Sequence, residues 1–247
     1  MSHISLKNVS VSFPIFTGST RSLRQEIFST LGGSISEHAK TTFVHALHDI
    51  TLEIEQGDRL GIVGHNGAGK TTLLRVLSGI YPPSSGDLEI QGDVTTLTDV
   101  SLGMDTEATG WQNIIFRSVM MGKTYSEAKA LSPAIADFSE LGEFLDLPVR
   151  TYSTGMFMRL AFAISTAFTP DILVLDELIG AGDAAFQTKS LTRLRGLLDE
   201  SNIIVISSHN LGIIKEHCNK AVYLGKGRVL AQGGVDEVLE HHRLDNV

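Results

Sequence analysis

Residues 64–72 read Gly64-His65-Asn66-Gly67-Ala68-Gly69-Lys70-Thr71-Thr72. The first eight match the phosphate-binding pattern G-x-x-x-x-G-K-[ST], which forms a turn between a strand and a helix. The flanks fit, because an apolar run precedes the turn and leucines at helical spacing follow it. Glycines allow backbone N–H groups to surround phosphate oxygens, Lys70 would reach the β- and γ-phosphates, and the Thr71 hydroxyl would ligate Mg²⁺. We therefore predict that all nine residues bind a nucleotide.

Two acidic residues end the apolar run Ile172-Leu173-Val174-Leu175-Asp176-Glu177. A buried parallel strand would deliver both carboxylates to the sheet edge beside the phosphate turn. We predict that Asp176 holds Mg²⁺ through water and that Glu177 orients and polarises an attacking water molecule. Together with the phosphate turn, the pair indicates a P-loop nucleoside triphosphatase.

A GTPase is the first alternative to an ATPase. Guanine recognition usually uses the pattern N-K-x-D, and here Asn219-Lys220-Ala221-Val222 places a valine where the aspartate is needed. The sequence therefore argues against guanine specificity.

Composition narrows the class of protein. The 247 residues are 42% hydrophobic, and 28 acidic against 20 basic residues give a net charge of −8, which argues against nucleic acid as a partner. One cysteine, Cys218, cannot form an internal disulfide. The N-terminus lacks a secretion signal, and no apolar run approaches the ~20 residues that cross a bilayer. We expect a soluble or membrane-peripheral protein on the cytosolic side.

Alternating apolar runs and helical patterns predict an α/β fold with a largely parallel central sheet. The segment at about 99–165 is nearly all helical in pattern, which predicts a helical sub-lobe, and Pro133 would separate two of its helices. The predicted strands cover residues 4–13, 46–54, 58–63, 171–176, 202–207, 220–224 and 228–231, and residues 86–98 are predicted to be strand and turn.

Four further features occur in the order of a known family. Ser153-Thr154-Gly155-Met156 opens a predicted helix 23 residues before Asp176 and resembles the signature motif, L-S-G-G-Q, of ATP-binding cassette (ABC) ATPases. His209 follows an apolar run and looks like their switch histidine. Asp183 looks like their D-loop aspartate. Phe13 ends the first predicted strand, where the family places an aromatic residue that stacks on adenine.

The resemblance covers nearly the whole chain and implies its organisation. Residues 1–247 would form one ABC nucleotide-binding domain with a P-loop NTPase fold. Its RecA-like core would span about 1–98 and 166–247, with an N-terminal antiparallel β part, a helical subdomain at about 99–165 and an interface insert at about 14–44.

The resemblance also implies a mechanism. Two copies would face each other and sandwich two ATP molecules with Mg²⁺, each ATP lying between the phosphate turn of one copy and the signature residues of the other. Lys70, Glu177 and His209 would be catalytic, and closure of the dimer would drive transmembrane permease subunits.

Less specific interpretations remain open for some of these residues. Ser153 could serve only as a helix N-cap, and His209 could be an ordinary histidine at a strand end. Phe16 and Phe43 are rivals to Phe13 as the aromatic residue at adenine.

Where the sequence departs from the general family pattern, it resembles one subfamily. The runs at 109–114, 152–163 and 182–189, the last with Phe186 and Lys189, resemble ATP-binding subunits of polysaccharide exporters of the Wzt-like O-antigen type, with capsule and teichoic-acid relatives. The family's usual glutamine is missing, since residues 97–105 contain none, and Thr98, Asp99 or Ser101 would replace it. Within the insert, Leu23, Ile27 and Leu31 recur every four residues and predict an amphipathic helix.

The resemblance thus implies an ATPase subunit at the cytoplasmic face of the inner membrane that powers export of a lipid-linked polysaccharide. Alternatives are an exporter of another cargo and a non-transport ABC ATPase. A regulator that binds but does not hydrolyse nucleotide is disfavoured by the intact catalytic residues.

Overall fold

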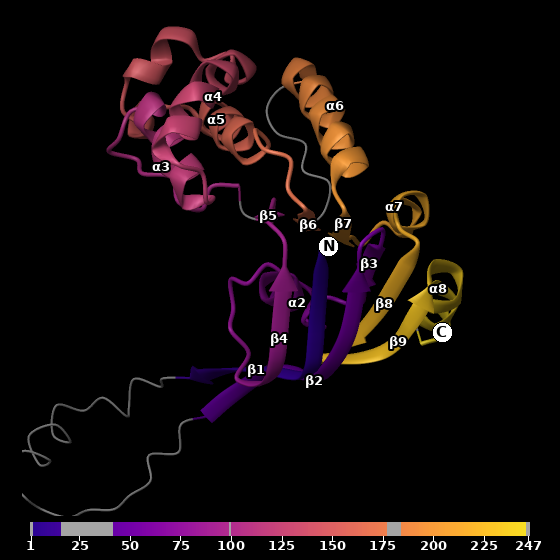
Figure 1. Cartoon of the computed structure of the whole chain (residues 1–247). Coiled ribbons are helices and arrows are strands. Elements are labelled where there is room, and N and C mark those ends of the chain that lie inside the picture. The colour runs from indigo at the N-terminus through magenta and orange to yellow at the C-terminus, as the bar shows by residue number, and fades with distance from the viewer. Residues whose placement is uncertain (1, 16–41, 99, 177–183, 246–247) are drawn as a thin grey trace, which may run out of the picture.

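The strands form two sheets in the computed structural model, which describes residues 2–15, 42–98, 100–176 and 184–245 (Figure 1). The first is an antiparallel sheet with the order β2-β1-β4, made by β1 (His3–Ile15), β2 (Thr42–Glu55) and β4 (Ser85–Gln91). Alternate residues of β1, such as Ile4 and Leu6, are buried. The predicted N-terminal antiparallel part is therefore confirmed.

The second sheet has six strands in the order β5-β6-β7-β3-β8-β9. All neighbours are parallel except β8 and β9, which form an antiparallel hairpin. The central strands are apolar throughout because both faces of the sheet are covered. This confirms the predicted α/β fold with a mostly parallel sheet. The strands are β3 (Arg59–Val63), β5 (Val94–Thr96), β6 (Ile172–Asp176), β7 (Ile203–Ser207), β8 (Lys220–Gly225) and β9 (Arg228–Gly234).

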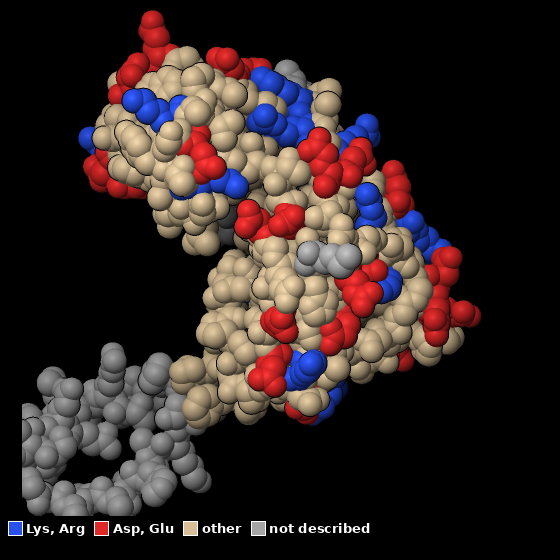
Figure 2. Space-filling view, viewed as in Figure 1, with Lys and Arg blue, Asp and Glu red and all other residues tan. Residues whose placement is uncertain are grey.

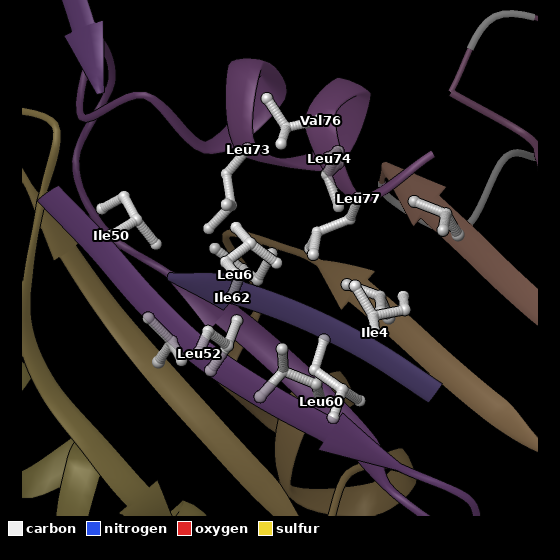
Figure 3. Close-up of a cluster of buried hydrophobic side chains, with 14 of the residues drawn as sticks. Ile4, Leu6, Ile50, Leu52, Leu60, Ile62, Leu73, Leu74, Val76 and Leu77 are labelled. Carbon is white, nitrogen blue, oxygen red and sulfur yellow. The ribbon is translucent and has the colours of Figure 1, made fainter. Parts of the chain in front are cut away.

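Helix α2 (Lys70–Leu77) packs where the two sheets meet. Its buried side chains Leu73, Leu74 and Leu77 face Leu6 and Ile62 from both sheets (Figure 3). The opposite face of the six-stranded sheet is covered by apolar residues of α6 (Ala184–Glu200), α7 (Leu211–His217) and α8 (Val235–Leu244). Because α2 is buried against both sheets, the loop that precedes it has a fixed position.

A helical lobe rises from the edge of the six-stranded sheet (Figure 1). It has its own apolar core, which includes Ile114, Ile135, Leu145 and Leu160. The lobe consists of α3 (Gly110–Met120), α4 (Tyr125–Ser139), the short 3-10 helices η2 (Gly142–Asp146) and η3 (Val149–Thr151), and α5 (Thr154–Ser165).

The prediction that Pro133 separates two helices is wrong. Pro133 lies inside α4, and its exposed position lets water solvate the carbonyl that its missing N–H leaves unbonded. The break falls between α3 and α4, where Gly122 has a φ of 87°. A capping box between Thr124 and Glu127 then starts α4, so local turn and cap chemistry places the boundary.

Helix α7 was not predicted; it is short, and the Asn210 side chain caps it by accepting a hydrogen bond from the Gly212 N–H at 2.9 Å. The predicted amphipathic helix around Leu23, Ile27 and Leu31 lies outside the described residues. Across the described parts of the chain, no helix combines the length and apolar character that crossing a bilayer requires.

Candidate active site

A cavity of about 750 Å³ lies over the loop between β3 and α2. Its size is that of a small-molecule site, and its walls come from both sheets. The described residues that line it are Val44, His45, Ala46, Asn66, Gly67, Gly69, Lys70, Thr71, Thr72, Thr98, Asp176, His209, Lys226 and Gly227.

The loop backbone requires glycine at two close approaches. Gly69 has a φ of 105°, and a Cβ there would lie 2.8 Å from the Ala46 carbonyl oxygen. Gly64 has a φ of 152°, and a Cβ there would collide with the Leu224 carbonyl. The glycines thus let the loop pack against β2 and β8 while the N-terminus of α2 faces the cavity, an arrangement that favours anions.

Lys70 is buried within this loop. Its ammonium group donates hydrogen bonds to the carbonyl oxygens of Gly64 at 2.7 Å and His65 at 3.0 Å. The side chain therefore curls back over the loop and lines the cavity, which places a positive charge where the sequence predicts phosphate.

The two predicted Mg²⁺ residues are in contact although 105 positions separate them. The Thr71 hydroxyl donates to Asp176 Oδ2 at 3.2 Å, and β6 carries Asp176 to this edge of the sheet. Oxygen ligands of this kind suit Mg²⁺, which usually keeps waters and takes its other ligands from phosphates. No cluster of three or more His, Cys, Asp or Glu side chains that could hold a metal occurs within the described residues. As two oxygen ligands, Thr71 and Asp176 fit Mg²⁺ that arrives together with a nucleotide.

Thr98, one of the three candidates to replace the missing glutamine, lies at the cavity. Strands β5 and β6 are parallel with Thr96 opposite Val174, and Thr98 lies two residues beyond the end of β5. Its hydroxyl also lies 2.9 Å from the Thr96 hydroxyl. Among the described lining residues Ser101 does not appear, and Asp99 lies outside the described part of the chain.

His209 reaches the same cavity from the end of β7. Strand β7 lies between β6 and β3, so the histidine follows the strand next to the one that carries Asp176. Glu177 and Asp183 lie outside the described residues, and their predicted roles remain predictions.

Phe13 is not brought to the cavity. Its ring packs edge-on against Tyr81, with centroids 5.4 Å apart, and the opposite residue on β2, Val44, lines the cavity in its place. Phe43 is also absent from the lining among the described residues, and Phe16 lies outside them. The structure therefore adds no support for an aromatic platform from these three residues.

The signature residues lie apart from the cavity, at the start of α5 in the helical lobe. Ser153 is the N-cap, and its hydroxyl oxygen accepts a hydrogen bond from the Met156 N–H at 3.2 Å. Ser153, Thr154 and Gly155 are exposed, and none of the described lining residues comes from 153–156. The helix start therefore faces outward, with the Ser153 side chain bonded to one of the first N–H groups of α5.

Sequence reasoning missed the contacts that hold the loop from behind. The Gly227 N–H donates to the Ala68 carbonyl oxygen at 2.9 Å, and the His48 N–H donates to that of Gly227 at 2.8 Å. The turn between β8 and β9 thus links the loop to β2 through backbone hydrogen bonds. The glycines at 225 and 227 are the available signal in the sequence, but by themselves they indicate only a hairpin turn.

His242 of α8 packs against the phosphate loop, a contact that no pattern in the sequence indicates. Its ring stacks on His65 of the loop, with centroids 5.8 Å apart, and meets the edge of Tyr223 at 5.0 Å. Burial lowers the pKa of His242, and the positive charges that His65 and Lys70 can carry lower it further. Helix α8 therefore supports the back of the loop.

Comparison with known proteins gives both sequence and structure matches. Residues 47–180 match the family model described as ABC transporter. The O-antigen export system ATP-binding protein RfbE of Yersinia enterocolitica is 44% identical over 93% of this chain and 97% of that protein. The O-antigen export system ATP-binding protein RfbB of Myxococcus xanthus is 40% identical over 98% of this chain and 56% of that protein. The ABC transporter protein AbcA of Aeromonas salmonicida is 37% identical over 98% and 76%.

Among solved structures, an ATP-binding subunit of an ABC transporter aligns with a TM-score of 0.66 and 20% identity over 99% of this chain and 95% of its own. A dimeric ATP-binding cassette, MJ0796, in a post-hydrolysis state with ADP and Pi, aligns with a TM-score of 0.65 and 18% identity, covering 94% and 98%. At these identities the likeness establishes the fold.

Proposed function

The chain belongs to the ABC transporter family, and on that premise we propose that it is the ATP-hydrolysing subunit of an exporter that moves lipid-linked polysaccharide of the O-antigen type across the inner membrane. We also propose that it forms one nucleotide-binding domain, with a core at about 1–98 and 166–247 and a helical subdomain at about 99–165.

The observation that carries ATP hydrolysis is the meeting of Lys70, Thr71 and Asp176 at one cavity. Lys70 and the N-terminus of α2 would bind the β- and γ-phosphates, while Thr71 and Asp176 would hold Mg²⁺. The ion would neutralise charge on the phosphates when it is bound. Glu177 would accept the proton of the attacking water, and His209 would orient that water and the γ-phosphate.

The exposed signature residues support a second copy of the chain as partner. Each nucleotide would lie between the loop at 64–72 of one copy and Ser153 to Met156 of the other. The start of α5 would then direct its N–H groups and the positive end of its dipole toward the γ-phosphate. The cavity within one chain lacks these donors in its described lining, so catalysis would require the dimer.

The cargo rests on the relatives. Two of them are named O-antigen export proteins, and one is matched along 97% of its length. No described side chain needs to contact sugar for this proposal, because the ATPase would drive a permease that carries the cargo. Another exported cargo, such as capsule or teichoic acid, is the alternative.

An apolar patch supports a permease as partner. Leu102, in the turn at 100–103, and Phe116, Val119 and Met120 of α3 are 43–70% exposed. Exposed apolar clusters mark contact surfaces. We propose that permease subunits dock on this patch and thereby hold the protein at the cytoplasmic face of the inner membrane.

Deletion and complementation test this function. In a strain that lacks the gene, surface polysaccharide should disappear and accumulate on its lipid carrier inside the cell. The wild-type gene should restore surface display, and Lys70→Ala should not. Unchanged surface polysaccharide in the deletion strain would reject the cargo, whereas ATP hydrolysis by the purified protein tests the ATPase separately.

A further inference from the structure

Three helices that carry different parts of the proposed machinery meet at one carboxylate, Glu140. Glu140 Oε1 accepts a hydrogen bond from Lys189 Nζ of α6 at 2.7 Å. Glu140 Oε2 accepts one from Arg159 Nη1 of α5 at 3.4 Å. Glu140 itself ends α4. One side chain therefore connects the end of α4 to α5, which begins at the signature residues, and to α6.

The backbone at Glu140 shows that its side chain is not incidental. Glu140 is the C-cap of α4 and adopts a left-handed conformation, with φ 57° and ψ 30°. Glycine or asparagine usually occupies such a position, since other residues adopt it at a cost in free energy. A glutamate here is explained by what its carboxylate holds, because the turn alone would be more stable with glycine.

The two cations that bond this carboxylate lie over aromatic rings, Arg159 over Phe186 and Lys189 over Phe138. Phe138 of α4, Phe162 of α5 and Phe186 of α6 form an aromatic cluster, with ring centroids 5.6–6.3 Å apart. Lys189 Nζ also donates to the Phe138 carbonyl oxygen at 3.1 Å and so caps the end of α4. The sequence motif that contains Phe186 and Lys189 thereby gains a physical role.

The three helices belong to different parts of the molecule. Helices α4 and α5 are in the helical lobe, whereas Leu194, Leu197 and Leu198 anchor α6 to the six-stranded sheet. Figure 1 shows α6 beside the lobe, and Figure 2 shows Lys and Arg side chains gathered where the two meet. The contact therefore fixes the lobe, and with it Ser153, relative to the sheet that carries the phosphate loop.

We propose that Glu140 is a positioning residue that, through Lys189 and Arg159, sets the orientation in which the signature residues meet the nucleotide on a second copy. This inference rests on the proposed ATP-sandwich dimer. If the contact is lost, the lobe samples orientations that cannot engage the partner, and the apparent affinity between copies falls by the fraction of competent molecules. Turnover in a fully formed dimer does not change, because Glu140 does not touch the cavity.

The variant Glu140→Gly tests this with little risk to folding, since glycine suits the left-handed backbone while removing the carboxylate. We expect the protein concentration that gives half-maximal specific ATPase activity to rise about 5- to 10-fold. The plateau rate should stay within twofold and the Tm should not fall. Lys189→Met should reproduce the shift, and Lys189→Arg should largely preserve wild-type behaviour.

Glu107→Gln is the matched control, because it breaks an exposed ion pair with Arg150 in the same lobe that does not involve α6. The inference is overturned if Glu140→Gly behaves like this control, or if the plateau rate falls while the half-maximal concentration stays constant. A wild-type protein whose specific activity does not depend on concentration would instead reject the proposed dimer. The two failures are therefore distinguishable.

Discussion

The loop at 64–72 and the residues at 153–156 both contain glycine and both lie at the start of a helix, but among the described residues only the loop meets side chains from the ends of other strands. Asp176, Thr98 and His209 converge on the loop from three different strands or strand ends. Ser153, Thr154 and Gly155 are exposed at the edge of the helical lobe. Under the proposed function these are two half-sites: the first would bind nucleotide in a single copy, and the second would complete a site on another copy.

The largest effect should come from Glu177→Gln, which separates binding from chemistry at the first half-site. Loss of the proposed base should lower turnover by about 10²–10⁴-fold, while Mg-ATP still binds and a dimer with two trapped nucleotides accumulates. Single-turnover hydrolysis and light scattering measure the two effects. Unchanged steady-state hydrolysis would remove Glu177 from the mechanism.

Lys70→Ala should impair both steps at the first half-site. Removal of the charge at the phosphates should lower hydrolysis by about 10²–10³-fold and weaken nucleotide binding in the monomer as well. Fluorescent ATP titration checks the binding. Lys226→Gln, which changes another lysine that lines the cavity, is the control and should have a much smaller effect. Equal effects of the two variants would mean that the total positive charge at the cavity matters and that Lys70 has no specific role.

Ser153→Arg tests the second half-site and should impair hydrolysis without weakening nucleotide binding by the monomer. Hydrolysis should fall by roughly 10²-fold because the donors to the partner's nucleotide are blocked, whereas binding by the monomer should stay at the wild-type level. Ser126→Arg, in the first turn of α4, is a control on the same lobe. If Ser153→Arg weakened monomer binding as much as Lys70→Ala does, the division into half-sites would be wrong.

The smallest effect concerns His242, which supports the first half-site from behind. Burial lowers the pKa of His242 in the folded state. The contribution of His242 to stability is therefore present above the unfolded pKa of about 6.5 and is lost as the pH falls through the lower folded value. The Tm of His242→Gln should therefore fall less between pH 7.5 and 5.5 than that of the wild type. His241→Gln, at an exposed neighbour, should keep the wild-type pH dependence, and equal slopes for both variants would contradict the assignment.

Local patterns in the sequence were enough to predict most of the fold and the contact between Thr71 and Asp176. The buried strands at 172–176 and 203–207 are continuous apolar runs, and the glycine turn before Lys70 has a fixed spacing. Parallel strands necessarily bring their C-terminal ends to one edge, so the meeting of Thr71 and Asp176 followed from the pattern.

Features set by tertiary packing could not be predicted in this way. The choice of Thr98 depends on the register between β5 and β6, and Phe13 packs on Tyr81, a contact that no local pattern specifies. Pro133 failed as a helix breaker because exposure on α4 lets the helix tolerate it. Glu140 bonds to Arg159 and Lys189, which lie 19 and 49 positions further along the chain, and these contacts are visible only after the helices are placed.

The dependence of specific ATPase activity on protein concentration tests the two-half-site account most directly. We predict that activity per molecule rises in proportion to concentration at high dilution and reaches a plateau when dimers form with Mg-ATP, and that Ser153→Arg abolishes the rise. A constant specific activity from a protein that remains a single copy throughout the dilution series would contradict the account.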